Sequence, residues 1–205
     1  MTVRVITEPS AEPITLAEAK LHLRVETGAT ADDSLITSMI TVARQYAENY
    51  TRRAFVKRTL ELTLPAIPSG GVFCLPFPPL VSVSWIKYVD VDGVLQTKLA
   101  SEYQVDTYRE PGLIKPAYLE TWPVVTRNDF NAIQVRYIAG YPESGSPDTD
   151  VDYAANIPAA IKHWLKIRVG TLYENREAIV VGVSQSMIHR DFIDGLLDPY
   201  VVDLF

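Results

Sequence analysis

The chain has 205 residues, and 19 lysines and arginines against 25 aspartates and glutamates give it a formal net charge of −6. Hydrophobic residues make up 47% and charged residues 21%, which is ordinary globular usage and excludes a wholly disordered chain. This length predicts one domain or two, with enough residues to bury a core. Because an acidic protein repels phosphate backbones, the charge argues against sequence-independent binding of nucleic acid.

Cysteine usage and hydropathy narrow the class of protein further. Cys74 is the single cysteine, which excludes an internal disulfide and a cysteine-rich zinc site. No apolar run approaches the ~20 residues that a membrane-spanning helix needs, and the first residues lack the apolar core of a signal peptide. We therefore expect a globular protein that is made and kept in a reducing cytoplasm.

Proline placement divides the chain into regions of different structure. Eleven of the 14 prolines fall between Pro65 and Pro158, whereas the stretches 14–64 and 159–198 contain none. Proline removes a hydrogen-bond donor and clashes inside helices, so long helices are expected where it is absent. The distribution predicts helices first, then strands and turns, then helices again.

Two helices are predicted in the first proline-free stretch. Thr15 and Glu18 have the spacing of a capping box, which predicts a short helix to about Leu23. A second helix follows Asp32 and Asp33, whose carboxylates can accept hydrogen bonds from the free N–H groups at its start. Its apolar residues recur every three or four positions and predict one buried stripe. The stripe consists of Leu35, Ile36, Met39, Ile40, Val42, Ala43, Tyr46, Ala47 and Tyr50.

Alternation of polar and apolar residues predicts strands in the middle of the chain. The clearest runs are 58–64 and 81–88, and Asp92-Gly93 between valines predicts a hairpin turn. Further short strands are expected at 103–106, 112–114 and 132–137. Together these runs predict a small antiparallel sheet inserted between helices.

The last helix is predicted to begin at Pro158, because proline favours the first position of a helix. Apolar residues such as Ile161 and Trp164 continue the helical spacing to about Asn175. We therefore predict an α+β protein, mainly an α-helical bundle of N- and C-terminal helices with an inserted small antiparallel β domain. Three parts are expected. Residues 1–54 form an N-terminal helical part, residues 55–141 form the β-rich insertion, and residues 142–205 form a C-terminal helical part with an apolar tail. The two helical parts are expected to pack as one bundle.

No motif predicts catalysis, a cofactor or a metal. His22, His163 and His189 fall on separate predicted segments without metal-ligand spacing. The glycine loops that bind phosphate and the serine elbow of hydrolases are both absent. Cys74 lies among apolar residues with no histidine near it in the sequence, which indicates a buried structural thiol. We therefore predict no catalytic residues, no cofactor and no metal site.

The C-terminal tail is the strongest local sign of an interaction. Its apolar residues are too few for a helix core and too apolar for a free end in water. They either fold back as an edge strand or lie exposed and dock on another chain. The candidate partner interface consists of Tyr200, Val201, Val202, Leu204 and Phe205.

An order of landmarks along nearly the whole chain is similar to that of a known family. The run ITLAEAKLHLR at 14–24 opens the pattern, and DDSLI at 32–36 begins the long helix. The chain thus resembles the head-tail connector (adaptor) proteins of long-tailed bacteriophages, prophages and gene transfer agents. The other landmarks lie at 47–53, 78–83, 136–142, 157–162 and 172–177.

The resemblance implies a structural virion protein of the head-tail interface, present in the host cytoplasm during assembly. Such adaptors form a homo-oligomeric ring, usually a dodecamer, between the portal protein and the tail-side stopper protein. DNA passes through the ring without being specifically bound, and no membrane is involved. An acidic chain suits this role, because a lumen that held phosphates would slow the passage of DNA.

Two other interpretations remain open at this stage. The same composition would fit another virion completion or stopper protein, which copy number and position in the particle would distinguish. A small hydrolase whose carboxylates and histidines converge only in the fold would instead show a deep pocket with perturbed titratable groups.

Overall fold

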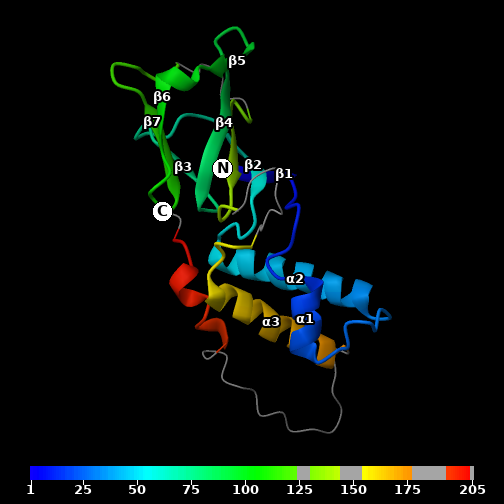
Figure 1. Ribbon diagram of the computed structural model, residues 1–205. Helices are drawn as coiled ribbons and strands as arrows, with labels where there is room; N and C mark the ends of the chain where they lie inside the picture. The colour runs from blue at the N-terminus through cyan, green and yellow to red at the C-terminus, as the bar shows by residue number, and fades with distance from the viewer. Residues whose placement is uncertain (124–129, 144–153, 177–192, 204–205) are drawn as a thin grey trace. The chain divides into compact units, whose positions relative to one another are not determined.

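The computed structural model describes residues 1–123, 130–143, 154–176 and 193–203. The chain divides into two compact units, one formed by 1–10, 56–142 and 202–205 and the other by 11–55 and 143–201. We call the first the β-rich unit, because it holds strands β1 to β8, and the second the helical unit, because it holds helices α1 to α3 (Figure 1). Among the described residues, no helix is both long and apolar enough to cross a membrane.

Helix α1 (Leu16–Leu23) begins at the predicted capping box. The backbone N–H of Glu18 donates to Thr15 Oγ1 at 3.1 Å, and the N–H of Thr15 donates to Glu18 Oε2 at 2.9 Å. The helix ends where Arg24 adopts a left-handed conformation, with φ of 58°. These reciprocal bonds satisfy N–H groups that have no partner inside the helix, which is why the sequence signal located this helix start correctly.

Helix α2 (Asp33–Thr51) is the longest helix of the described residues, and its start differs from the prediction. Asp32 is the N-cap residue, but its side chain makes no capping hydrogen bond. Its Oδ2 instead accepts hydrogen bonds from Tyr173 Oη at 2.6 Å and from Arg176 at 3.0 Å. The expected local cap is therefore replaced by a long-range tie to the end of α3 (Ala159–Glu174).

The apolar residues of α2 form two stripes rather than the single buried stripe that was expected. Ile36, Ile40, Ala43 and Ala47 are buried against the rest of the helical unit. Leu35 and Met39 are only half-buried, and Val42 and Tyr46 are exposed. Tyr46 nevertheless stacks on Trp164 of α3, with ring centroids 5.8 Å apart. The second stripe therefore lies at the edge of the contact between α2 and α3, where it is partly open to solvent.

A buried ion network joins α2 to the segment before α1. Arg44 Nε donates to Glu12 Oε2 at 2.7 Å, and Arg44 Nη1 donates to Glu48 Oε2 at 2.9 Å. Glu48 Oε1 also accepts from the backbone N–H of Phe55 at 2.8 Å. Buried charges are tolerated when they are paired and hydrogen-bonded in this way. Through Glu12 and Glu48, the network holds the segment before α1 and the segment after α2 against α2.

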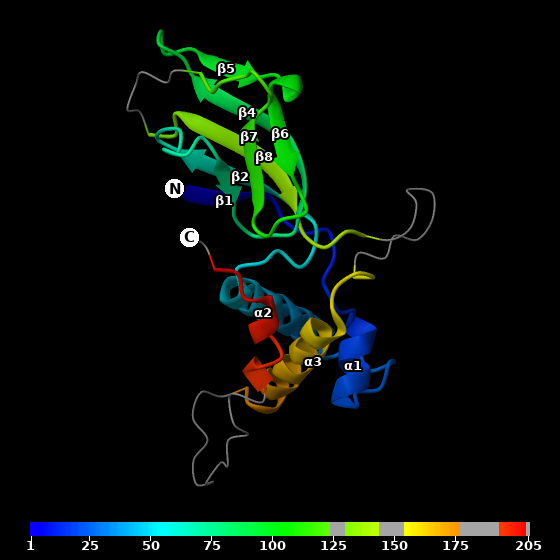
Figure 2. The ribbon, with the colours of Figure 1, turned by 90° about the vertical axis from the view of Figure 1, so that its left-hand side faces the viewer.

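The β-rich unit consists of two antiparallel sheets facing each other (Figure 2). The five-stranded sheet has the order β1-β2-β8-β4-β5, and the three-stranded sheet has the order β3-β7-β6. The first sheet is built from β1 (Thr2–Thr7), β2 (Arg58–Leu64), β8 (Ile133–Ala139), β4 (Leu80–Val89) and β5 (Leu95–Lys98). The second is built from β3 (Phe73–Leu75), β7 (Gly112–Pro116) and β6 (Tyr103–Asp106).

The core of the β-rich unit lies between the two sheets. Leu62, Val135 and Tyr137 from the larger sheet and Phe73 and Ile114 from the smaller one are all almost completely buried. The Tyr137 hydroxyl donates to the carbonyl of Pro76 at 2.8 Å, which satisfies its polar group inside this core. Alternation of apolar residues along β2 and β8 directs one face of the sheet inward, as the period of two requires.

Gly140, directly after β8, is required by the close approach of two chain segments. Its φ is +131°, a conformation that L side chains rarely adopt. A Cβ atom at this position would lie 2.5 Å from the backbone nitrogen of Lys57. Only glycine allows the chain to pass so close to the segment entering β2.

The predicted α+β class with antiparallel strands is confirmed, whereas a mainly helical protein is not. Among the described residues, the strands hold about as many residues as the helices, and the strands form two sheets instead of one. Strand β1 was not predicted, although Val3 and Val5 alternate with polar residues. It is an exposed edge strand that pairs only with β2, and such a strand depends on its partner more than on its own residues.

Candidate functional site

The helical unit has a surface hollow beside the half-exposed stripe of α2. It measures about 250 Å³ and lies between the first half of α2 and the last turn of α3. We call it the α2–α3 groove. Its lining residues are Leu35, Ser38, Met39, Val42, Leu172, Asn175 and Arg176.

The apolar wall of the groove comes from α2 and the polar edge from α3. Leu35, Met39 and Val42 follow at four- and three-residue spacing, so they share one side of the helix. Hydrogen bonds from Tyr173 and then Arg176 lower the pKa of Asp32. Asp32 therefore stays ionised and holds the end of α3 beside the groove. An apolar wall with a fixed cationic edge is suited to binding apolar side chains of a protein partner, and less suited to catalysing a reaction.

The tail residues predicted as a partner interface do not share one environment. Tyr200 ends the short 3-10 helix η2 (Asp198–Tyr200), and its carbonyl accepts from Arg53 Nε at 2.6 Å. Tyr50 Oη donates to Asp198 Oδ1 at 2.7 Å, so η2 is anchored to the end of α2. Val201 is exposed and Val202 is buried. Leu204 and Phe205 lie outside the described residues.

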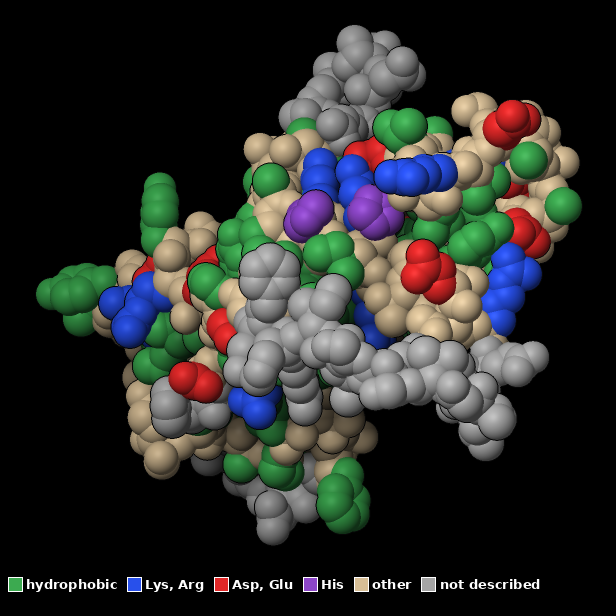
Figure 3. All heavy atoms as spheres, turned by 90° about the horizontal axis from the view of Figure 1, so that it is seen from below, with side chains coloured by type: hydrophobic (Ala, Val, Ile, Leu, Met, Phe, Trp, Pro, Cys, Tyr) green, Lys and Arg blue, Asp and Glu red, His purple; other side chains and the backbone are tan. Residues whose placement is uncertain are grey.

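The histidines and the cysteine do not meet at a common site in the described part of the chain. His22 lies close to Gly170 of α3, His163 is exposed, and His189 is outside the described residues. Histidine side chains on the face in Figure 3 lie among Lys and Arg side chains, and such neighbours oppose the binding of a cation. No group of three or more His, Cys, Asp or Glu side chains that could hold a metal occurs in the described ranges.

Cys74 lies on β3 and is half-buried. Burial raises the pKa of its thiol, which keeps it protonated near neutral pH. A protonated thiol is a weak nucleophile, and this environment matches the structural role expected from the sequence.

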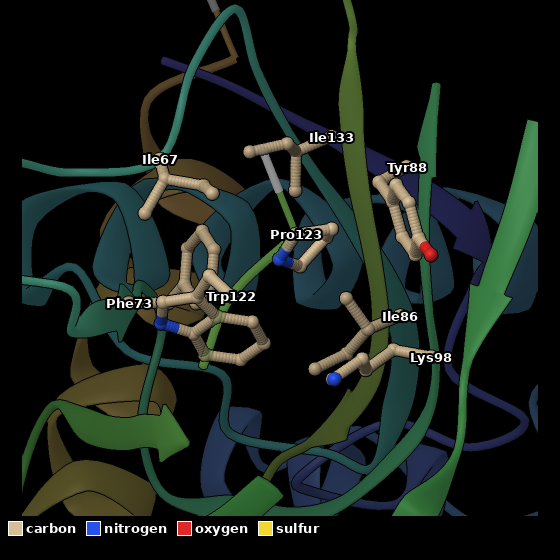
Figure 4. A pocket seen from close by; sticks show the side chains of 8 residues that line it. All are labelled: Ile67, Phe73, Ile86, Tyr88, Lys98, Trp122, Pro123 and Ile133. Carbon is tan, nitrogen blue, oxygen red and sulfur yellow. The ribbon is translucent and has the colours of Figure 1, made fainter. Parts of the chain in front are cut away.

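A second hollow lies inside the β-rich unit and is too small for a ligand (Figure 4). Phe73 and Trp122 meet edge to face, with ring centroids 4.7 Å apart, and Trp122 Nε1 donates to the carbonyl of Gly71 at 2.6 Å. Ile86 and Ile133 close the other side, and the free volume is about 10 Å³. A space of this size holds at most one water molecule, so this is core packing and not a substrate pocket.

The α2–α3 groove is therefore the best candidate site, and sequence reasoning missed it. The signal was present in the apolar spacing of α2, which is too wide for one buried face. Leu35 and Ile36, like Val42 and Ala43, are consecutive, so they point to neighbouring sides of the helix. A single neighbouring helix cannot cover an apolar arc of this width. Such an arc therefore indicates that the helix contacts a second neighbour.

The fold of the whole chain is similar to that of solved neck proteins. A chain from a structure described as the neck of an empty GTA particle, computed with C6 symmetry, matches with a TM-score of 0.77 and 20% identity. A chain from the virion of a native gene transfer agent (GTA) particle matches with a TM-score of 0.75 and 19% identity. A chain from the neck of a native GTA particle, computed with C12 symmetry, gives 0.72 and 19%. Each match covers 100% of this chain and 98% of the other.

The family match is confined to the first third of the chain. No curated protein sequence matches it. Residues 13–72 match the model of the phage gp6-like head-tail connector protein family. This range includes α1, α2 and β2, and with them the apolar wall of the groove. The family resemblance predicted from the sequence is thereby confirmed: residues 13–72 match the phage gp6-like head-tail connector family.

Proposed function

We propose that this protein is a structural virion component, a head-tail connector in the neck of a phage-like particle, with no enzymatic role. The observation that carries the proposal is the family match over 13–72 together with a neck-protein fold over the full length. The apolar groove supports it, because a structural component needs surfaces for other chains. Its place would be the head-tail interface of the particle, after assembly in the host cytoplasm.

Copies of the chain would form a closed ring, and twelve is the number we propose. The C12 symmetry of one similar neck structure supports this number, and the C6 symmetry of another is compatible with it. Ring closure needs a heterologous contact, in which one surface of each copy binds a different surface of the next. The α2–α3 groove is the concave half of such a contact, with Leu35, Met39 and Val42 as its apolar wall.

The remaining partners follow from the role of a connector. One end of the ring would bind the portal protein and the other the tail-side stopper protein, and DNA would pass through without being specifically bound. The tail beyond η2 is the proposed portal contact. Val201, the first residue of this tail, is exposed and therefore accessible to a partner. We retain 1–54, 55–141 and 142–205 as the proposed functional parts, with the difference that residues 1–10 of the first part belong to the β-rich unit. The particle would be encoded by a phage or prophage.

Copy number in the particle tests this proposal directly. Particles purified from the source would be quantified by mass spectrometry, with the portal subunit as the internal standard. We expect about one copy of this chain per portal subunit, since both rings would share the particle axis. Absence of the chain from particles that contain portal protein would refute the proposed function.

A variant of the groove tests the ring contact. Val42→Asp places a charge on the apolar wall without burying it inside the helical unit, and Gln45→Asp on exposed α2 surface outside the groove is the matched control. We expect at least a tenfold loss of Val42→Asp protein from particles and normal incorporation of Gln45→Asp, because a charge at the centre of an apolar contact is costly. Equal incorporation of both would show that the groove is not a contact.

A further inference from the structure

Bulky apolar side chains are exposed at one end of the β-rich unit. Tyr118 and Leu119, in the turn after β7, are 85% and 87% exposed. Leu99, just before the 3-10 helix η1 (Ala100–Glu102), and the β4–β5 hairpin expose further side chains. We call this set the apolar end: Val91, Val94, Leu95, Leu99, Tyr118 and Leu119.

Hydrogen bonds and ion pairs hold these loops together at the same end. Lys98 Nζ donates to the carbonyl of Thr121 at 3.3 Å and lies 2.9 Å from Glu102 Oε2. The backbone N–H of Ala117 donates to the carbonyl of Glu102 at 3.1 Å. The turn after β7, η1 and the end of β5 are therefore tied together, so the apolar end is a preformed surface.

The stability of the fold does not explain why position 119 holds a leucine. The N–H of Glu120 donates to the carbonyl of Ala117 at 3.0 Å, which makes Leu119 the third residue of a tight turn. Its φ is 66°, in the left-handed region, where glycine or asparagine is favoured. A leucine here adds backbone strain and leaves its side chain in water, so glycine would serve the fold better. Backbone strain and side-chain exposure together indicate that the Leu119 side chain contacts another molecule.

The net charge around the apolar end is negative. Asp90, Asp92, Glu102 and Glu120 lie within or beside it, against the largely covered cation Lys98 and the exposed cation Lys115 on β7. A hydrogen bond from Gln96, with further backbone hydrogen bonds, lowers the pKa of Asp90 and keeps it ionised. Such a rim repels anionic lipid headgroups and the phosphates of DNA. It complements a surface that carries lysines and arginines.

We propose that the apolar end docks on another protein, through a surface that has apolar pockets for Tyr118 and Leu119 and a rim of lysines or arginines. The central aromatic and aliphatic side chains would supply most of the binding, and the acidic rim would supply orientation and rate of encounter. This contact is separate from the α2–α3 groove. It goes beyond the proposed connector function by assigning a task to the β-rich unit.

Photocrosslinking in assembled particles tests this proposal. Particles would be produced with full-length chain carrying p-benzoylphenylalanine at position 118 and, as the control, at position 108. Tyr108 is 97% exposed and lies in the β6–β7 turn, at the opposite end of that hairpin. We expect position 118 to crosslink to a peptide of another protein in which apolar residues neighbour lysine or arginine, and position 108 to give no such product. Crosslinks to a second copy, to an acidic peptide, to both positions equally, or no crosslink would overturn the proposal.

A pair of variants separates the contact from folding and from the connector function. Leu119→Gly is expected to keep or raise the Tm, while Tyr118→Ser combined with Leu119→Gly lowers the yield of complete particles at least tenfold. Tyr108→Ser should leave the yield unchanged. A normal yield from the double variant, or a lower Tm for Leu119→Gly, would contradict the inference. The copy-number measurement tests the connector proposal independently of these variants. Absence of the unmodified chain from particles would refute the connector proposal and not the contact at the apolar end.

Discussion

The two apolar stripes of α2 have the same residue spacing but lie in different environments. Ile40, in the inner stripe, is 2% exposed, whereas Val42, two residues later in the outer stripe, is 53% exposed. The sequence pattern is alike in both, because each stripe repeats at three- or four-residue spacing. Periodicity in the sequence therefore identifies an apolar side of a helix, but it does not identify which neighbour covers that side. The inner stripe is covered within this chain, and the outer one is partly open to solvent.

The largest effect is expected from a charge in the inner stripe. Ile40→Asp would bury an unpaired carboxylate among apolar side chains, which costs several kcal/mol, about the total stability of a small unit. We expect the helical unit to lose its cooperative unfolding transition, as measured by circular dichroism in a urea titration. An unchanged transition midpoint would mean that the inner stripe is not a core.

The next largest effect is expected at the ion network beside the inner stripe. Arg44→Ala removes an ion-pair partner of both Glu12 and the buried Glu48, and breaking a buried ion pair by removing one partner costs about 3–5 kcal/mol. Urea unfolding should show this loss, while Gln45→Ala, the exposed neighbour, should change stability by no more than about 0.5 kcal/mol. Similar midpoints for the two variants would show that the network contributes little.

A smaller effect, dependent on pH, is expected in the β-rich unit. Burial alone would raise the pKa of Glu61, but hydrogen bonds from Arg4 and Arg136 outweigh it and lower the pKa below 4.5. The ionised carboxylate therefore stabilises the fold above pH 4.5, and this contribution is lost as the pH falls toward the folded-state pKa. Glu61→Gln should be less stable than the natural chain at pH 7 and should lose less stability between pH 5 and pH 3. The control is Glu26→Gln, at an exposed position in the helical unit.

The smallest effect on stability is expected in the outer stripe. Val42→Asp exchanges residues of similar helix propensity at an exposed position, so the free energy of unfolding should change by no more than about 0.5 kcal/mol. The comparison is sharp because Ile40→Asp makes the same kind of change two residues away. A large destabilisation by Val42→Asp would show that both stripes belong to one core, and the proposed contact would then lose its basis.

Local signals in the sequence predicted most of the elements. The capping box at Thr15 located α1, and alternation located β2 with its bounds at Arg58 and Leu64. Each of these signals is contained in a few neighbouring residues, so it can be recognised before any distant contact is known. Strands β1 and β3 were missed because an edge strand and a three-residue strand take their stability from their partners.

The candidate site was predictable only in part. The tail was chosen from its composition, but the sequence did not indicate that Tyr50 and Arg53 anchor η2 while Val202 is buried. The groove depends on how α3 crosses α2, and Asp32 was expected to cap its own helix. It binds Tyr173 and Arg176 instead, because a charged partner brought close by the fold competes with the local N–H groups.

The α+β class, the main helices and strands, the connector resemblance and the lack of a recognisable catalytic motif could all be predicted from the amino-acid sequence. These follow from propensity, period and capping, which act over a few residues. The tertiary structure alone decided which apolar residues stay uncovered: Val42 and Met39 beside the groove, and Tyr118 and Leu119 at the apolar end. Burial is a property of neighbours that are distant in the sequence, so only the packed fold distinguishes a core residue from one available to a partner.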